Sequence, residues 1–149
     1  MDLRAALPML LPHAISWAES RAAEVARQPL DERGTSIALA VGVTRPEKVR
    51  IAFVQSLPMP EHAELRAVAV QNGLLTPGMV GLTLGHAVYI CEGHLSVRLL
   101  SHELRHVYQY EQAGSIAAFL PVYLQQIAQF TYARAPLELD ARAHEQSGT

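Results

Sequence analysis

A pair of histidines with a glutamate between them is the feature of this sequence best suited to chemistry. His102 and His106 lie four positions apart, and Glu103 directly follows the first histidine. On a helix, residues four apart project about 40° from each other, so both imidazoles can reach one ion. Neutral imidazole is a preferred zinc ligand, with its nitrogen about 2.0–2.1 Å from the ion. This H-E-x-x-H spacing therefore predicts a zinc site, with Glu103 beside it as a base.

The residues around the motif indicate the helix that must carry it. Ser96 is a typical N-cap and Gly114 a typical stop, so we expect a helix from Ser96 to about Ala113. On that helix Glu103 falls in the middle of the apolar face, with the two histidines at its margin. An ionised carboxylate buried there without a partner would cost several kcal/mol. An ordinary amphipathic helix with surface histidines would leave Glu103 unexplained. The side of this helix that we expect to face water carries Arg98, Arg105 and Gln109.

A hydrolytic zinc site needs a third protein ligand and one open position. Pro136 suits the first position of a final helix that runs to about Glu145 and carries Glu138. With this helix the chain resembles the gluzincin branch of zincin metallopeptidases, in which a glutamate ligand follows the H-E-x-x-H helix, often as E-x-x-A-D. Glu138 and Ala141 match that pattern, whereas Arg142 stands where the pattern has its aspartate.

The resemblance implies that His102, His106 and Glu138 are the zinc ligands. Asp140 and His144 remain alternatives for the third ligand, because both lie on or beside the same final helix. Since Arg142 cannot act as a carboxylate partner of a zinc-bound histidine, another residue must do so, and Asp140 is one candidate.

The resemblance extends to a longer segment, from about residue 79 to residue 142. Its sequence is similar to small bacterial H-E-x-x-H domains, some of which are found with contractile injection systems. It is carried by Gly81–Gly85, Ala87–Ile90 and Leu99–Gln109. The likeness implies hydrolysis of a peptide or protein substrate, with Glu103 taking a proton from a zinc-activated water. Tyr132 or Arg134 would then donate to the developing oxyanion.

The hydrophobic pattern predicts the elements that position this site. Alternation of apolar residues indicates strands at 49–54, 79–84 and 87–91, and helical spacing indicates helices at 13–28, 31–41, 61–71 and 115–130. We therefore expect an α+β fold, and one domain over residues 1–149 with an N-terminal part (1–75) and a motif-bearing part (79–149). The resemblance implies a minimal zincin-like domain: a small three-stranded sheet packed on the active-site helix, with helical segments at both ends. The strand at 79–84 or at 87–91 is expected to align a peptide substrate.

Composition excludes several other classes of function. Half of the 149 residues are hydrophobic and the formal net charge is −2, so a packed core is expected and nucleic acid is not an expected partner. The apolar stretch 5–18 is interrupted by Pro8 and Pro12 and is too short to cross a bilayer, so no membrane contact is expected. The single cysteine, Cys91, favours a reducing compartment. We therefore expect the protein in the cytoplasm, although secretion remains open.

A second function fits the same residues. A non-catalytic module of a bacterial assembly could keep zinc for stability alone and act as a binding or adaptor domain. The chain ends 11 residues after Glu138, so we also expect a short or open cleft that a protein partner could complete. The other histidines are expected to be ordinary surface, turn or loop residues: His13, His62, His86 and His94.

Overall fold

The computed structural model describes residues 2–24 and 28–148 as a mixed fold of helices and one small sheet. Its elements in chain order are α1 (Leu3–Glu24), β1 (Gln28–Pro29), α2 (Glu32–Ala40), the short 3-10 helix η1 (Pro46–Lys48), β2 (Arg50–Val54), α3 (Ala63–Gln71), β3 (Gly81–Leu84), β4 (Ala87–Cys91), α4 (Val97–Ala113), α5 (Ile116–Phe130) and α6 (Pro136–Ala143). The expected α+β class is confirmed. The described helices include none that is long and apolar enough to cross a membrane.

The sheet has the strand order β1-β2-β4-β3. β2 runs parallel to β4, and the outer strands β1 and β3 pair antiparallel with their neighbours. The three predicted strands are confirmed as β2, β3 and β4, but the prediction of three strands was wrong by one. Residues 28–29 pair with 50–51 and form β1, a two-residue strand created by a tertiary contact, which has no sequence period to reveal it.

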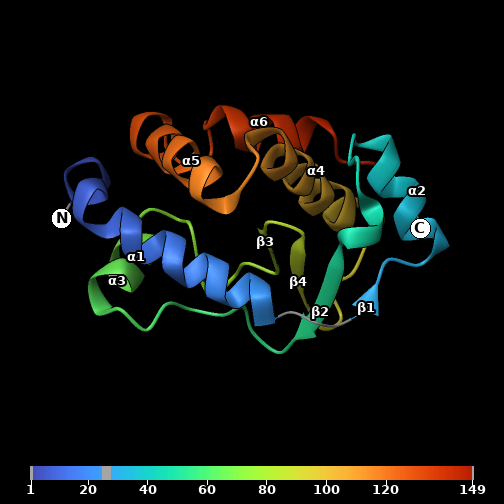
Figure 1. Cartoon of the computed structure of the whole chain (residues 1–149), viewed down its shortest axis with the longest axis horizontal. Helices are drawn as coiled ribbons and strands as arrows, with labels where there is room; N and C mark the ends of the chain where they lie inside the picture. The colour runs from blue at the N-terminus through green and yellow to red at the C-terminus, as the bar shows by residue number, and fades with distance from the viewer. Residues whose placement is uncertain (1, 25–27, 149) are drawn as a thin grey trace.

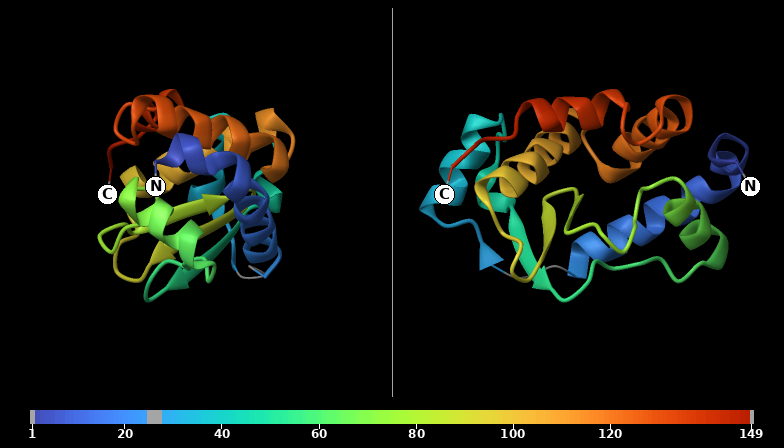
Figure 2. Two further views of the ribbon diagram at one scale, coloured as in Figure 1. Left: turned by 90° about the vertical axis from the view of Figure 1, so that its left-hand side faces the viewer. Right: turned by 180° about the vertical axis from the view of Figure 1, so that it is seen from behind.

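The helices cover the sheet unevenly. Figure 1 shows α4, α5 and α6 together above the sheet. α1 runs from beside the sheet to the N-terminus at the left of the picture. The view from behind in Figure 2 shows α3 beside the far end of α1. One core lies between α2, α4 and the sheet, and contains Leu104, Val107, Val88 and Ile90. Two further apolar clusters join α1 to α5 and to α3, so the N-terminal helix is part of the domain.

The first helix begins earlier than the predicted start at residue 13. α1 starts at Leu3 and continues through Pro8 and Pro12, each of which removes a backbone hydrogen bond from the helix. Its buried residues are Leu3, Ala6, Leu7, Leu10, Ala14 and Ala18. Burial of this apolar face stabilises α1 by more than the two prolines destabilise it. The predicted end at residue 28 was also wrong, because α1 ends at Glu24, residues 25–27 lie outside the described residues, and residue 28 is in β1.

Local capping signals were reliable. Asp31, Ser96 and Ser115 cap α2, α4 and α5 with their side chains, and Gly114 ends α4 with a φ of 100°. Glycine is favoured there because a Cβ disfavours this left-handed conformation. His62, expected on a helix surface, instead caps α3 through its ring nitrogen. α6 ends at Ala143, two residues before the predicted end.

The expected solvent-facing side of α4 is largely covered. Gln109 is only 5% exposed. Arg105 donates to Asp140 on α6 at 2.8 Å and to the carbonyl of Val41 at 2.8 Å. The prediction was wrong for these two residues because α6 and the end of α2 pack against this side of the helix. Arg98 is exposed, as expected.

Candidate metal centre

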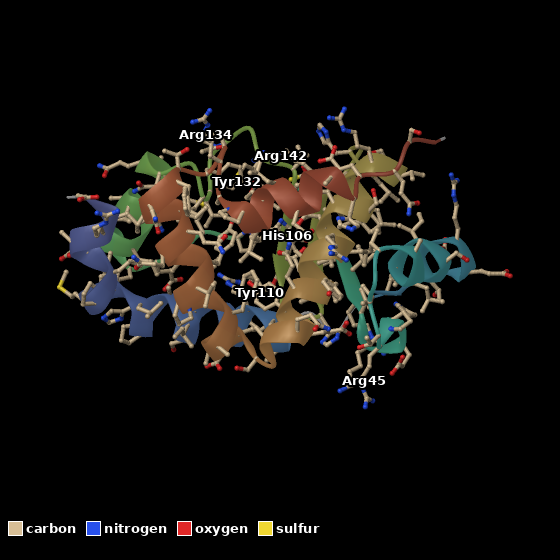
Figure 3. All side chains as sticks on the ribbon, turned by 90° about the horizontal axis from the view of Figure 1, so that it is seen from above. Arg45, His106, Tyr110, Tyr132, Arg134 and Arg142 are labelled. Carbon is tan, nitrogen blue, oxygen red and sulfur yellow. The ribbon has the colours of Figure 1, made fainter. Side chains whose placement is uncertain are left out.

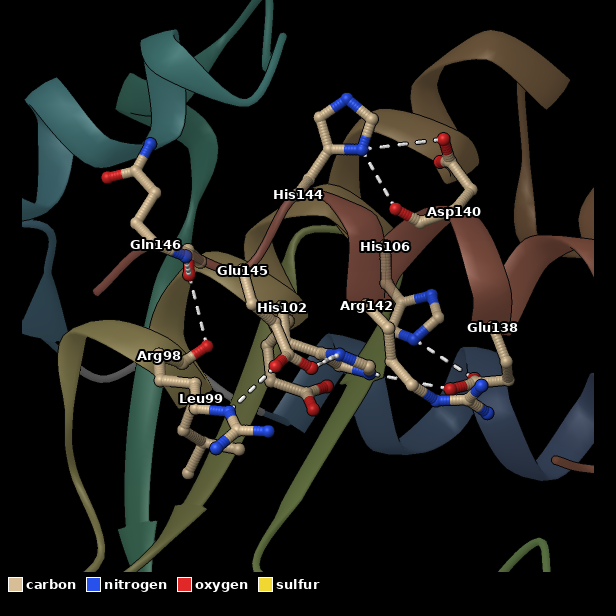
Figure 4. Close-up of polar contacts among 12 residues, drawn as sticks. Arg98, Leu99, His102, His106, Glu138, Asp140, Arg142, His144, Glu145 and Gln146 are labelled. Carbon is tan, nitrogen blue, oxygen red and sulfur yellow. Dashed lines mark hydrogen bonds and ion pairs between the residues drawn. The ribbon is translucent and has the colours of Figure 1, made fainter.

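Helices α4 and α6 bring three side chains together from distant parts of the chain. His102, His106 and Glu138 each offer a ligand atom, and these atoms all lie within 4.8 Å of one another. Nε2 of His106 lies 3.0 Å from Glu138 Oε2, and Nε2 of His102 lies 3.4 Å from Glu138 Oε1 (Figure 4). Both imidazoles therefore point their Nε2 atoms at one carboxylate, and this group could hold a metal ion.

The environment of Glu138 fits a cation at this position. The residue is 2% exposed, and its Oε1 atom is buried with no hydrogen-bond partner among the described residues. Burial would raise the pKa of this carboxyl, but its contacts with His102, His106 and Tyr123 hold the pKa well below its usual range. An ionised, buried carboxylate is costly unless a positive charge compensates it.

Despite burial, the neighbouring carboxylates raise the pKa of both histidines. Burial lowers the pKa of His106, but the contact with Glu138 and the charges of Glu138 and Glu103 outweigh it and raise the pKa to about 9. The pKa of His102 is also raised, because its contact with Glu138 and the charge of Glu103 outweigh burial. The raised pKa values favour the protonated imidazoles, so a metal ion that binds here would displace protons from the two rings.

Each histidine is oriented through its other ring nitrogen. Nδ1 of His102 lies 2.8 Å from Glu145 Oε2, and Nδ1 of His106 lies 2.8 Å from Gln109 Oε1. Such partners fix the ring orientation and leave Nε2 free to bind a metal. Asp140, the carboxylate expected in this role, contacts neither ring and instead accepts from Gln109 at 2.9 Å. Asp140 therefore supports His106 indirectly, through the side-chain amide of Gln109.

Sequence reasoning missed Glu145, which lies beyond the end of α6. The chain folds back over α4 there, and Gln146 donates its backbone N–H to Ser101 at 2.8 Å. The only available signal was an acidic residue near the final helix, and no spacing rule ties such a residue to His102. The alternative third ligands are not in the group: Asp140 pairs with Arg105, and His144 contacts Asp140.

Glu103 lies beside this group, under the edge strand β3. It is 6% exposed, and its Oε1 accepts a hydrogen bond from the Thr83 hydroxyl at 2.8 Å. β3 comes so close to α4 that a Cβ on Gly81 would lie 2.9 Å from Glu103 Oε2, so a larger residue there would displace the Glu103 carboxylate. Thr83 is a second residue missed from the sequence, because its pairing with Glu103 depends on how β3 packs on α4.

The two predicted oxyanion donors differ in position. Tyr132 is half-buried, and burial together with the nearby charge of Glu138 raises the pKa of its phenol, so it keeps its proton. Arg134 is exposed and points away from the centre (Figure 3). A second tyrosine, Tyr123 on α5, was not singled out from the sequence, and its hydroxyl donates to Glu138 Oε2 at 2.8 Å.

The loop that carries Tyr132 is held in an unusual conformation. Thr131 has a φ of 72° and a ψ of 165°, a region that residues other than glycine rarely occupy. Arg142 on α6 donates to the carbonyl of Ala133 at 2.8 Å and to that of Tyr132 at 3.3 Å. Arg142, at the position where the gluzincin pattern has an aspartate, thus ties the loop of Tyr132 to the helix of Glu138.

The remaining histidines lie outside the group. The ring of His13 lies against that of His62 in a tilted arrangement, and His86 contacts Glu111 at 2.9 Å. His94 is exposed in the loop before α4, as expected. Cys91 is a free, buried thiol at the end of β4.

Comparison of the chain with protein-family models, with curated proteins and with solved structures finds no significant match. The assignment of function therefore depends on the site itself.

Proposed function

We propose that this protein is a zinc-dependent peptidase with a minimal zincin-like, gluzincin-type site, in which Glu103 is the general base. The observation that supports this most strongly is the convergence of ligand atoms of His102, His106 and Glu138 within 4.8 Å, next to the buried carboxylate of Glu103. Structural zinc sites usually have four protein ligands, whereas this cluster of described residues offers three and leaves a position open.

The residues around the centre have distinct roles in this mechanism. Zinc bound to such ligands polarises a carbonyl group and lowers the pKa of water. Glu103 takes a proton from the attacking water and passes it to the leaving amine. Thr83 holds one oxygen of Glu103 at 2.8 Å and so restricts its rotation. Tyr132, which keeps its proton, donates to the oxyanion that develops on the carbonyl.

The edge of the sheet offers a place for the substrate backbone. β3 pairs with β4 on one side and has no strand on its other side among the described residues. An extended peptide can add to such an edge through main-chain hydrogen bonds. Of the two strands considered from the sequence, only β3 has this free edge, and it is also the strand that lies over Glu103. A protein partner that completes the cleft would bind beside this edge.

The test combines metal analysis with one isosteric substitution. We expect about one zinc per chain in the wild type and in Glu103→Gln, and a loss of peptide hydrolysis of about 100-fold or more in the variant. Thr83 can still donate to the new amide oxygen, so the fold should be retained. Glu61→Gln, an exposed position, is the matched control and should leave activity unchanged. A wild-type protein that binds no zinc would refute the proposal. Bound zinc without hydrolysis would favour the non-catalytic binding module.

A further inference from the structure

An apolar pocket reaches the candidate metal centre from the N-terminal half of the molecule. Its walls come from α1, α3, β3, α4 and α5, and include Trp17, Leu65, Phe119 and Leu120. Glu103, His106 and Glu138 also line it, so the pocket and the centre share a wall. Apart from these three, no described residue that lines it carries a charge.

A second, polar pocket lies on the other side of Glu103. Its lining includes His94, Arg98, His102 and Glu145. The two pockets share Met79, Gly81, Glu103 and Tyr132. The proposed base and oxyanion donor therefore lie where an apolar cavity and a polar cavity meet, beside the free edge of β3.

We propose that the apolar pocket receives a large, uncharged apolar side chain of the substrate next to the bond that is cleaved. Helices α1 and α3, which carry no catalytic motif, then select the substrate. This inference rests on the proposed peptidase function, because the scissile bond is placed by the metal centre. It assigns to residues 1–75 a role in specificity that their sequence does not indicate.

The chemistry of the lining supports an apolar occupant. A charged side chain would lose its hydration among alanine, leucine and aromatic side chains without gaining a partner away from the metal centre. The small residues Ala14, Ala18 and Ala69 leave space between the larger walls. The indole Nε1 of Trp17 is buried and has no hydrogen-bond partner among the described residues.

The chain supplies its own probe for the test. Trp17 is the only tryptophan, so its fluorescence reports on this pocket alone. Blocked glycine peptides with one variable residue (Leu, Phe, Ala, Lys or Asp) are titrated into the protein with and without zinc, and affinity is measured by calorimetry. We expect Leu and Phe peptides to bind about tenfold or more tightly than Ala, and to change the emission of Trp17. Equal affinity for Leu, Ala and Asp peptides would overturn the proposal.

Filling the pocket gives an independent check. Ala14→Leu places a larger side chain in the α1 wall and should remove most of the preference for Leu and Phe peptides while zinc is retained. Ala5→Leu is the matched control, since it makes the same change at an exposed position of the same helix. If Ala14→Leu does not fold, the peptide series on the wild type still decides. An unchanged preference in a folded Ala14→Leu variant counts against the pocket.

The two proposals fail in different ways. Hydrolysis without preference for a large apolar residue beside the cleaved bond would refute the pocket and leave the peptidase intact. Apolar binding at Trp17 without any hydrolysis would refute the peptidase and leave a selective binding pocket.

Discussion

The two halves of this chain contribute to one site in different ways. The motif-bearing half, residues 79–149, places its reactive side chains at short helical spacings, as with His102 and His106 on α4. The N-terminal half, residues 1–75, contains no such spacing, yet α1 and α3 form walls of the apolar pocket. Reactive side chains that share one helix have a fixed spacing, so the sequence shows them. A cavity is shaped by side chains from many elements, and it has no pattern of its own.

The halves are joined by a carboxylate on the motif helix. Glu111 of α4 accepts hydrogen bonds from the backbone N–H groups of Thr44 and Arg45 at 2.8 and 3.0 Å. It also contacts His86 at 2.9 Å. One side chain thus ties the loop after α2 to the helix that carries the motif.

The largest effect on zinc binding is expected for Glu138, the proposed ligand on α6. In Glu138→Gln the charge is lost from the centre, so zinc affinity should fall by more than the roughly 100-fold typical of removing an outer partner. Tyr123 can still donate to the new amide, which favours retention of the fold. Zinc binding is measured by competition with a chelator. His144→Gln is the control and should keep its zinc; if it loses zinc and Glu138→Gln does not, the third ligand has been misassigned.

A smaller effect is expected for the residue that orients His102. Removing the carboxylate in Glu145→Ala should weaken zinc binding by about 10- to 100-fold. Arg98→Gln is a matched control, because Arg98 contacts the other oxygen of Glu145 at 2.7 Å and does not touch the histidine. It should have a clearly smaller effect on zinc affinity. Equal losses in the two variants would mean that the whole C-terminal segment, and not this contact, supports the site.

The smallest effect is expected for Glu111, the carboxylate that links the two halves. It is a change in the free energy of unfolding that depends on pH. Burial would raise the pKa of Glu111, but hydrogen bonds from Thr44, His86 and Arg45 outweigh it and lower the pKa. A lowered pKa stabilises the fold above the unfolded value of about 4.3, and this stability is lost as the pH falls through the folded value. Glu111→Gln should therefore lower the free energy of unfolding by about 1–2 kcal/mol at pH 7.

Urea unfolding at several pH values checks this prediction. The difference between wild type and Glu111→Gln should shrink as the pH falls below the unfolded value of about 4.3 and through the lower folded pKa, where the wild-type carboxyl becomes protonated. Glu47→Gln, on the exposed part of η1, is the control and should show little difference at any pH. A difference of constant size across this range would show that the charge of Glu111 is not its cause.

Much of the fold could be predicted where the signal is local. Ser96 is recognisable from the sequence as the cap of α4, because a cap needs only a side chain and the next turn of helix. The predictions failed where distant contacts outweigh local preference. Pro8 and Pro12 argue against a helix, but the buried face of α1 outweighs them. The helical period places Gln109 on the side that faces water, but α6 covers it.

By itself the sequence determined the relation of His102, Glu103 and His106, since the helical period places them without reference to the rest of the chain. It also indicated Glu138 as the third member of the group, through a resemblance rather than through geometry. Only the tertiary structure decided that Glu145 and Gln109 orient the two rings, that Thr83 holds Glu103, and that an apolar pocket ends at this centre. The physical reason is that these contacts join segments whose separation in the chain follows no period, so they exist only once the core has packed.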